Sequence, residues 1–409
     1  LKRGYAMKRW KIKKVPFSKK IMTGLFAGAM TLSIWAPSSQ AAVPEKNGYH
    51  TIHLTSNTWL KWDVFREWQS DDAGIILYNG NMGDNEQFVF FPLDGGTYAI
   101  VNKNSGKPVG INEGNWAAYW SDGVRNFNVD NREAFQQKNW NGNPEEQWYL
   151  RDRGNNNYEI VNQAYGKVAS YAGNGQVGSW FQAYVDLDNA NPSDSNRLFV
   201  IPATPRSTFA LPTLPAVGTR PNAPQYNPNG SIDQQLPQTS ESTVVAATLI
   251  PCIMVKDNGA SDYTKIHNSP YYVLEKEEYW EKARSEIIPA GSSSKYVVKT
   301  GVSTVDQQKM TDTLAMNFGA DLGFKFGDTS ASLKYGISKT LQTEISKTST
   351  ESTESTEEKT ITSISNKNTG FTAYQLVTKY TLKRTDGTAV SSSWTVRDKN
   401  QTLVRTITN

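Results

Sequence analysis

Strict alternation of apolar and polar positions is clearest in residues 313–326, TLAMNFGADLGFKF, where even positions are apolar and odd positions are polar or small. This period of two predicts a β-strand with one apolar face and one polar face. After a turn-rich quartet, residues 331–345 alternate in the opposite phase. A two-residue turn at Asp328-Thr329 pairs apolar with apolar and polar with polar positions, so we predict an amphipathic hairpin over residues 313–345.

The apolar stripe of this hairpin has the length of a membrane crossing. Twelve residue steps at about 3.3 Å each span roughly 40 Å, or about 30 Å after a tilt of about 40°. The hydrocarbon core of a bilayer is about 30 Å thick. The residues predicted to face the membrane are Leu314, Met316, Phe318, Leu322, Phe324, Phe326, Leu333, Tyr335, Ile337 and Leu341. The alternative is a hairpin that covers the core of an ordinary β-sandwich, because any half-buried sheet alternates.

The remainder of the C-terminal half also has the composition of strands. Residues 346–360 contain no apolar residue, so both faces of a strand there must contact water. Two alternating stretches flank Asp386-Gly387, which predicts a second hairpin.

The N-terminal half contains an internal repeat. Residues 86–109 and 146–169 share Glu-Gln, Tyr, Ile-Val-Asn and Gly-Lys at an offset of sixty residues. A third copy is split: residues 49–60 match its second half and residues 195–202 its first half, with Arg197 in the place of the repeat Gln. Three copies closed by pairing the two ends predict a threefold β architecture. The alternative is a β-sandwich with a chance duplication.

Composition divides the chain further. Residues 1–41 hold an upstream extension and, from Met7, a basic block, an apolar run and small residues, which predicts a signal peptide and a secreted protein. Residues 203–240 hold seven prolines and predict a semi-rigid linker. The predicted domains are therefore residues 42–202 and 241–409.

The signal peptide also accounts for the basic charge of the chain. Nine of the 43 basic side chains lie in residues 1–41, so the remaining chain has 34 against 39 acidic ones and a formal charge of −5. This balance gives no electrostatic case for a nucleic-acid partner.

The Gln-x-(Trp or apolar) strands followed by Ile-Val-Asn and Gly-Lys resemble the repeat of ricin-type β-trefoil lectins. The resemblance implies a sugar site in each lobe, where a carboxylate binds hydroxyls and an aromatic ring packs on the sugar. In the first lobe it implies Asp63, Tyr78, Glu86 and Gln87, although Glu86 stands where the family has Asn. In the second lobe it implies Asn112, Trp140 and Gln147, with Asn112 in place of the Asp.

Long Ser/Thr-rich strands around one amphipathic hairpin resemble aerolysin-type pore-forming toxins. The stretches PCIMVKDNG, SPYYVLEKEEYWEKARSEIIPAG and TGVSTVDQQKMTDT resemble insecticidal toxins of spore-forming bacilli related to the mosquitocidal binary toxins. The expected fold is all-β, with an N-terminal β-trefoil followed by an elongated aerolysin-like β-sheet domain. The resemblance implies binding to a cell-surface glycan or glycoconjugate receptor, homo-oligomerisation, and insertion of a β-barrel into the target-cell membrane. A second toxin component is a further partner that it leaves open.

Candidate catalytic chemistry is weak. Cys252 is the only cysteine of the mature chain, and the three histidines lack metal-ligand spacing. We therefore expect no enzyme, cofactor or metal. Two alternatives remain: a secreted carbohydrate-binding lectin or adhesin with a non-inserting β-stalk, and a glycosidase with a trefoil appendage.

Basic residues in expected loops predict sites of proteolytic activation. They are Arg206, Arg220, Arg397 and Arg405.

Overall fold

The computed structural model describes residues 43–408 except 94–95, 112–117, 122–125, 130–132, 178–180, 315–353 and 365. The predicted signal peptide and residues 315–345 of the predicted hairpin lie outside the described residues.

In the N-terminal half, the described strands are β1 (Gly48–His50), β2 (His53–Leu54), β3 (Asn57–Val64), β4 (Ile75–Tyr78), β5 (Phe88–Pro92), β6 (Tyr98–Asn102), β7 (Val109–Ile111), β8 (Ala118–Ser121), β9 (Asn126–Val129), β10 (Phe135–Gln137), β11 (Trp148–Asp152), β12 (Asn157–Asn162), β13 (Val168–Val177), β14 (Phe181–Asp188) and β15 (Phe199–Val200). The short 3₁₀ helices between them are η1 (Phe65–Glu67), η2 (Asp84–Glu86), η3 (Pro144–Glu146) and η5 (Ser195–Arg197).

The described elements that follow are β16 (Ser207–Thr208), β17 (Thr243–Pro251), η6 (Cys252–Met254), α1 (Asp262–Asn268), β18 (Tyr271–Ile288), β19 (Ser293–Thr300), α2 (Thr304–Thr313), β20 (Ser355–Thr362), β21 (Thr369–Lys383) and β22 (Trp394–Thr408). None of the helices in the described part of the chain is long and apolar enough to cross a membrane.

Three equivalent units form the N-terminal half, and each places a 3₁₀ turn before a strand whose first residue is buried. η2 leads into β5, η3 into β11 and η5 into β15. Phe88 of β5 faces Asn102 of β6, and sixty residues later Trp148 of β11 faces Asn162 of β12. The third unit closes across the two ends of the domain, because β15 pairs with β2. The predicted β-trefoil is confirmed.

The third unit corrects one residue of the predicted repeat. Gln87 and Gln147 each follow the last residue of a 3₁₀ turn, and in the third unit Leu198 has this position. The assignment of Arg197 to it is therefore wrong, because Arg197 is still part of the turn.

The trefoil core is centred on Trp62, which is fully buried. The rings of Phe88, Phe135 and Phe199, from β5, β10 and β15, lie edge-on to its indole with centroids at 6.0, 5.5 and 5.6 Å. Aromatic rings prefer this arrangement, in which the positive edge of one ring meets the negative face of another. One side chain thus connects strands from different units.

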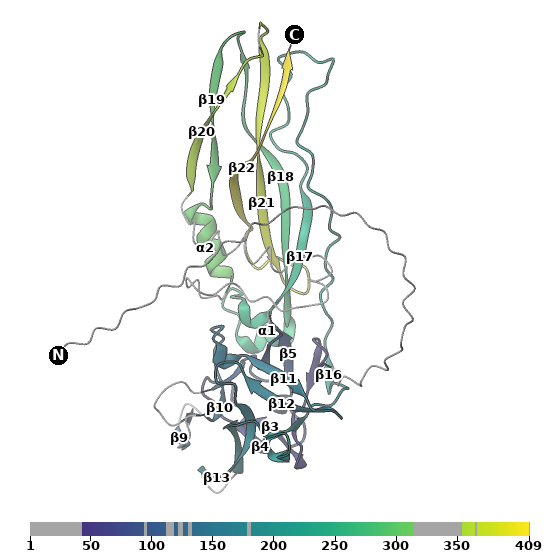
Figure 1. Ribbon diagram of the computed structural model, residues 1–409, viewed down its shortest axis with the longest axis vertical. Helices are drawn as coiled ribbons and strands as arrows, with labels where there is room; N and C mark the ends of the chain where they lie inside the picture. The colour runs from purple at the N-terminus through teal and green to yellow at the C-terminus, as the bar shows by residue number, and fades with distance from the viewer. Residues whose placement is uncertain are drawn as a thin grey trace, which may run out of the picture. The chain divides into compact units, whose positions relative to one another are not determined.

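The C-terminal half is built on an antiparallel sheet in the order β17-β18-β21-β22, with β19 and β20 paired as a separate ribbon. These long strands run side by side in Figure 1. The hairpin predicted around Asp386-Gly387 is confirmed, because β21 pairs with β22. Gly387 has a φ of 85°, a conformation that favours glycine in this turn.

The proline-rich segment 203–240 lies along this sheet. The Trp280 Nε1–H of β18 donates to the Pro221 carbonyl at 2.9 Å, and the Tyr374 hydroxyl of β21 donates to the Pro237 carbonyl at 2.6 Å. Apolar side chains of the segment pack against the same two rings. Side-chain donors thus satisfy carbonyls of a segment that has few backbone partners.

The trefoil and the C-terminal sheet share a hydrophobic core. The rings of Phe91 and Tyr271 lie edge to face at 5.0 Å, and the Tyr49 hydroxyl donates to the Ile266 carbonyl of α1 at 2.9 Å. A Cβ on Gly106 would lie 2.2 Å from the carbonyl oxygen of Asp262, so only glycine permits this approach.

The beginning of the predicted hairpin needs correction. Ser303 caps α2, which continues to Thr313, so the strand cannot begin at residue 313. Capping and the backbone hydrogen bonds of the helix outweigh the alternation at this residue. Leu314, which we predicted to face the membrane, is fully buried here and forms a β-bridge with Val255. The other predicted membrane-facing residues, from Met316 to Leu341, lie outside the described residues.

Candidate functional site

A cavity of about 610 Å³ opens in the first trefoil unit. In β3, Trp62 and Val64 pack in the core, so Lys61 and Asp63 point to the opposite, outer face of the strand. The register places Tyr78 of β4 beside Lys61 on this face. The residues that line the cavity are Asp63, Phe65, Arg66, Glu67, Ile76, Tyr78, Asn79, Gly80, Asn81, Asn85 and Glu86.

Asp63 is the buried carboxyl group of the cavity, with only 5% of its surface exposed. Its Oδ2 accepts a hydrogen bond from Asn85 Nδ2 at 2.9 Å. Burial, followed by the negative charge of Glu86, raises the pKa of Asp63 to about 8. The cavity therefore contains a carboxyl group that is fixed in place and becomes a strong acceptor in mildly alkaline solution.

Glu86 lines the same cavity, but its carboxylate is bound by backbone groups. Its Oε2 accepts from the N–H groups of Met82 and Gly83, and its Oε1 lies 3.6 Å from Lys61 Nζ. In the second unit, Glu146 likewise accepts from two backbone N–H groups of the preceding loop. The shared arrangement indicates that the Glu at this position of each unit stabilises the loop before the 3₁₀ turn.

Gln87 and Gln147 make equivalent hydrogen bonds in the two units. Gln87 Nε2 donates to the Met82 carbonyl at 3.0 Å, and Gln147 Nε2 donates to the Gly142 carbonyl at 2.9 Å. Neither Gln lines the cavity of the first unit. Glycan binding by Gln87 or Gln147 remains a prediction. In the structure, both side chains stabilise the loop that precedes the strand.

Asn85 is the polar residue that the sequence reasoning missed. The family pattern places an Asn near the repeat Gln, and the alignment assigned that place to Glu86. In the structure Asn85, one residue earlier, reaches Asp63. The signal was present as an Asn directly before Glu-Gln, but only the 3₁₀ turn decides which side chain points to the cavity.

Tyr78 lies at the mouth of the cavity with 49% of its surface exposed. Next to it, a Cβ on Gly80 would lie 2.1 Å from Glu86 Oε1, so a larger residue there would displace this carboxylate from its backbone partners. An open aromatic face beside hydrogen-bonding groups is suited to a ligand with both C–H faces and hydroxyls.

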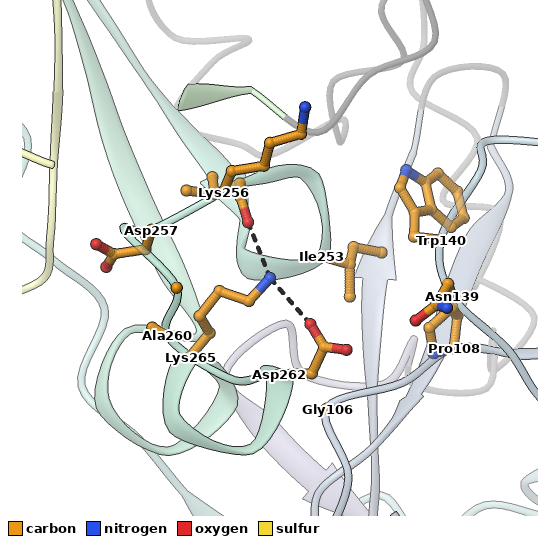
Figure 2. A pocket seen from close by; sticks show the side chains of 12 residues that line it. Gly106, Pro108, Asn139, Trp140, Ile253, Lys256, Asp257, Ala260, Asp262 and Lys265 are labelled. Atoms are coloured by element: carbon orange, nitrogen blue, oxygen red, sulfur yellow. Dashed lines mark hydrogen bonds and ion pairs between the residues drawn. The ribbon is translucent and has the colours of Figure 1, made fainter. Parts of the chain in front are cut away.

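The predicted residues of the second unit do not come together in one described site. Asn112 lies outside the described residues, and Gln147 is fully buried. Trp140 lines a different cavity, of about 390 Å³, beside η6 and α1. Figure 2 shows Trp140 and Asn139 across from Ile253, with Lys265 joined to Asp262. A sugar-stacking role of Trp140 remains a prediction.

The four predicted cleavage residues occupy different environments. Arg206 is exposed and precedes β16, whereas the Arg220 guanidinium donates to Glu278 at 2.6 Å. Arg397 and Arg405 lie within β22, so their placement in loops is wrong. β22 is the last strand in the order of its sheet, where polar residues are compatible with a strand. Cleavage at any of the four remains a prediction.

Candidate metal and nucleophile chemistry is limited in the residues that the structure describes. These residues contain no group of three or more His, Cys, Asp or Glu side chains that could hold a metal ion. Burial raises the pKa of Cys252 to about 12, so its thiolate is disfavoured at neutral pH.

Comparison with known proteins gives matches to both halves of the chain. Residues 84–184 match the family model of the ricin-type β-trefoil lectin domain-like proteins, and residues 243–405 match that of the insecticidal crystal toxin, P42. The chain is 28% identical over 325 residues to the binary larvicide subunit BinA of Lysinibacillus sphaericus, covering 78% of this chain and 80% of that protein. It is 33% identical over 191 residues to the subunit BinB of the same organism, covering 46% of this chain and 42% of BinB.

A solved structure shows the same fold. The crystal structure of Cry35Ab1 aligns with a TM-score of 0.65 and 21% identity, covering 88% of this chain and 90% of that one. The resemblance predicted from the sequence, a ricin-type lectin-like domain joined to an insecticidal toxin domain, is confirmed.

Proposed function

We propose that this chain, in which a ricin-type lectin-like domain precedes an insecticidal crystal toxin domain, is a secreted pore-forming toxin of the insecticidal type. Residues 42–202 bind a cell-surface glycan, and residues 241–409 oligomerise on the target-cell membrane. The predicted amphipathic hairpin, which begins after the end of α2 at Thr313, then inserts as a β-barrel. The similarity to larvicidal subunits named as parts of a binary toxin makes a second toxin component a candidate partner.

The observation that supports glycan binding most directly is the cavity of the first trefoil unit. A buried carboxyl group held by an amide, Asp63 with Asn85, lies in the same cavity as the exposed ring of Tyr78. A carboxylate binds two adjacent hydroxyls of a sugar, and an aromatic face packs on its C–H groups.

Two other functions are distinguishable by experiment. A lectin or adhesin with a non-inserting β-stalk binds the same glycans but does not release dye from liposomes that carry gut-membrane glycolipids. A glycosidase needs two carboxyl groups placed for acid and base catalysis. The second carboxylate of this cavity, Glu86, is occupied by backbone N–H groups, and turnover of a chromogenic sugar would contradict the proposal.

Removing either side chain of the first-unit site is expected to weaken glycan binding without unfolding the trefoil. On a glycan array read at a pH near the Asp63 pKa of about 8, we expect Asp63→Ala and Tyr78→Ala each to lower affinity by about 1–3 kcal/mol, through lost charge-assisted hydrogen bonds or lost ring packing. Tyr149→Ala is the matched control, because Tyr149 is also exposed but lies outside this cavity. Unchanged binding by both variants would remove the first-unit site.

Glycan affinity is also expected to depend on pH through Asp63. Its carboxyl group has a pKa near 8 in the folded chain and near 3.8 in an unfolded one. Between these two pH values, the Asp63 carboxyl group is protonated in the folded chain and ionised in the unfolded chain. The free energy of unfolding therefore falls as the pH rises through this range. Binding changes in the opposite direction, because the ionised acceptor forms only as pH approaches 8.

We expect the association constant to rise roughly tenfold per pH unit between about pH 6 and pH 8 and then to level off. Titration calorimetry with the best glycan from the array measures this profile. Asp63→Asn, which cannot ionise, serves as the control and is expected to bind weakly with a flat profile. The same rise in the Asn variant would assign the pH dependence to another group.

A further inference from the structure

The first trefoil unit has a second exposed aromatic ring on the same face as its cavity. Trp59 belongs to β3, and 73% of its surface is exposed, the largest exposed fraction among the described large hydrophobic side chains. An exposed indole within a regular strand loses the hydrophobic free energy that burial would supply. A single exposed apolar side chain needs no partner by itself, so the position of this ring relative to the cavity decides what it can bind.

The pleat of β3 places this ring in line with the cavity. Trp62 and Val64 pack in the trefoil core, so Trp59, Lys61 and Asp63 share the outer face. Tyr78 of β4 lies beside Lys61 in the register and has the same orientation. Along this face the order is therefore Asp63, then Tyr78, then Trp59.

The pairing of β3 with β4 ends at Lys61 and Tyr78, and Trp59 lies two residues beyond this last pair, in the direction in which the chain continues from Tyr78 to Gly80. Lys61 faces Tyr78, and residue numbers on the two strands change in opposite directions. Gly80 lines the cavity and contributes no side chain there, and the Glu86 carboxylate lies over it. Lys61, which lies between Trp59 and Asp63 on this face, is buried, and its Nζ donates to the Gly80 carbonyl at 3.1 Å.

The length of this row is more than one sugar ring spans. Trp59 and Asp63 are four residue steps apart, which is roughly 13 Å at about 3.3 Å per step in an extended strand. Along that distance the site offers a carboxyl group, one aromatic face, and then a second aromatic face. Apolar faces that alternate with hydrogen-bonding groups match a neutral oligosaccharide, whereas a protein partner is usually met by a more continuous apolar area.

We propose that Trp59 forms an outer subsite of the first trefoil unit, so that this unit takes an oligosaccharide of at least two sugar residues. The inner sugar lies in the cavity between Asp63 and Tyr78, and the next sugar packs its C–H face on the Trp59 indole. This inference rests on the proposed glycan-binding function and adds the class of ligand.

The test separates the outer subsite from the inner one. A printed array of mono-, di- and trisaccharides identifies the disaccharide that wild-type full-length protein binds best. That disaccharide and each of its two component monosaccharides are then titrated against the wild type, Trp59→Ala, Trp59→Phe and Tyr78→Ala. We expect Trp59→Ala to weaken the disaccharide about tenfold and to leave the monosaccharides unchanged. Trp59→Phe keeps a ring and should retain most of the affinity.

Each outcome decides between the two proposals. If Tyr78→Ala weakens both classes of sugar and Trp59→Ala weakens neither, the outer subsite is wrong and the glycan-binding function stands. If the wild type binds no sugar on the array, or Tyr78→Ala changes nothing, the proposed glycan site is wrong as well. If Trp59→Ala changes the sedimentation coefficient and not sugar binding, the ring belongs to a contact between copies of the chain, and the subsite is overturned.

A measurement on the wild-type chain gives independent evidence. N-bromosuccinimide oxidises exposed indoles, and peptide mass spectrometry reports oxidation at each tryptophan separately. The disaccharide is expected to protect Trp59, and the monosaccharides are not. Trp394, which is buried in the C-terminal sheet, serves as the internal control for an intact fold. Equal oxidation of Trp59 with and without the disaccharide would overturn the subsite.

Discussion

Leu322→Arg is expected to abolish dye release from liposomes that carry gut-membrane glycolipids, while glycan binding stays at the wild-type level. Residue 322 lies near the middle of the apolar stripe predicted from the alternation in residues 313–326. An arginine that faces lipid near the bilayer midplane costs about 2–4 kcal/mol in a β-barrel. This cost recurs in every subunit of a ring, so the total exceeds what a single exposed charge would impose.

The control places the same charge on the other face of the predicted strand. Asn317→Arg adds one positive charge as well, but to the face that would line a water-filled pore. We expect this variant to insert and release dye, with a changed preference between anions and cations in planar bilayers. Equal inhibition by both arginines, or inhibition by neither, would contradict insertion of this hairpin.

Trp62→Ala is expected to lower the free energy of unfolding by about 3–5 kcal/mol, the range for removing a large aromatic side chain from a packed core. The loss is large because the Trp62 ring contacts aromatic rings from three strands that are distant in sequence. A typical domain has only about 5–15 kcal/mol of stability. We therefore expect the trefoil transition in urea, followed by far-ultraviolet circular dichroism, to move to much lower denaturant concentration.

Trp59→Ala is the matched control for this measurement. It removes the same residue type from the same strand, but from the exposed outer face. Exposed substitutions usually change stability by less than about 0.5 kcal/mol. Similar losses in the two variants would mean that the trefoil core is not centred on Trp62.

Local patterns in the sequence were sufficient for the architecture of the N-terminal half. Three copies with the same turn and strand residues can bury their apolar faces only together, and this requirement predicts the closure of β15 on β2. The hairpin of β21 and β22 followed from alternation and an Asp-Gly turn for the same reason. Such features depend on residues close in sequence or repeated at a fixed offset.

The direction of individual side chains at the candidate site was decided by tertiary structure. Asp63 and Tyr78 were implied by the resemblance to ricin-type lectins, but the side chain that donates to Asp63 belongs to Asn85. The 3₁₀ turn directs the Glu86 carboxylate to backbone N–H groups. The periodicity of the sequence does not predict this orientation.

Long-range contacts decided the remaining differences. Trp140 lies between the two intact copies of the repeat in sequence. In the structure it lines a cavity together with residues of η6 and α1, more than a hundred positions away. Leu314 belongs to the alternating stripe, yet it is buried and forms a β-bridge with Val255, because α2 ends beside the segment that follows η6. Alternation determines which residues share a face of a strand. What that face contacts depends on segments far apart in sequence that meet only when the chain is folded.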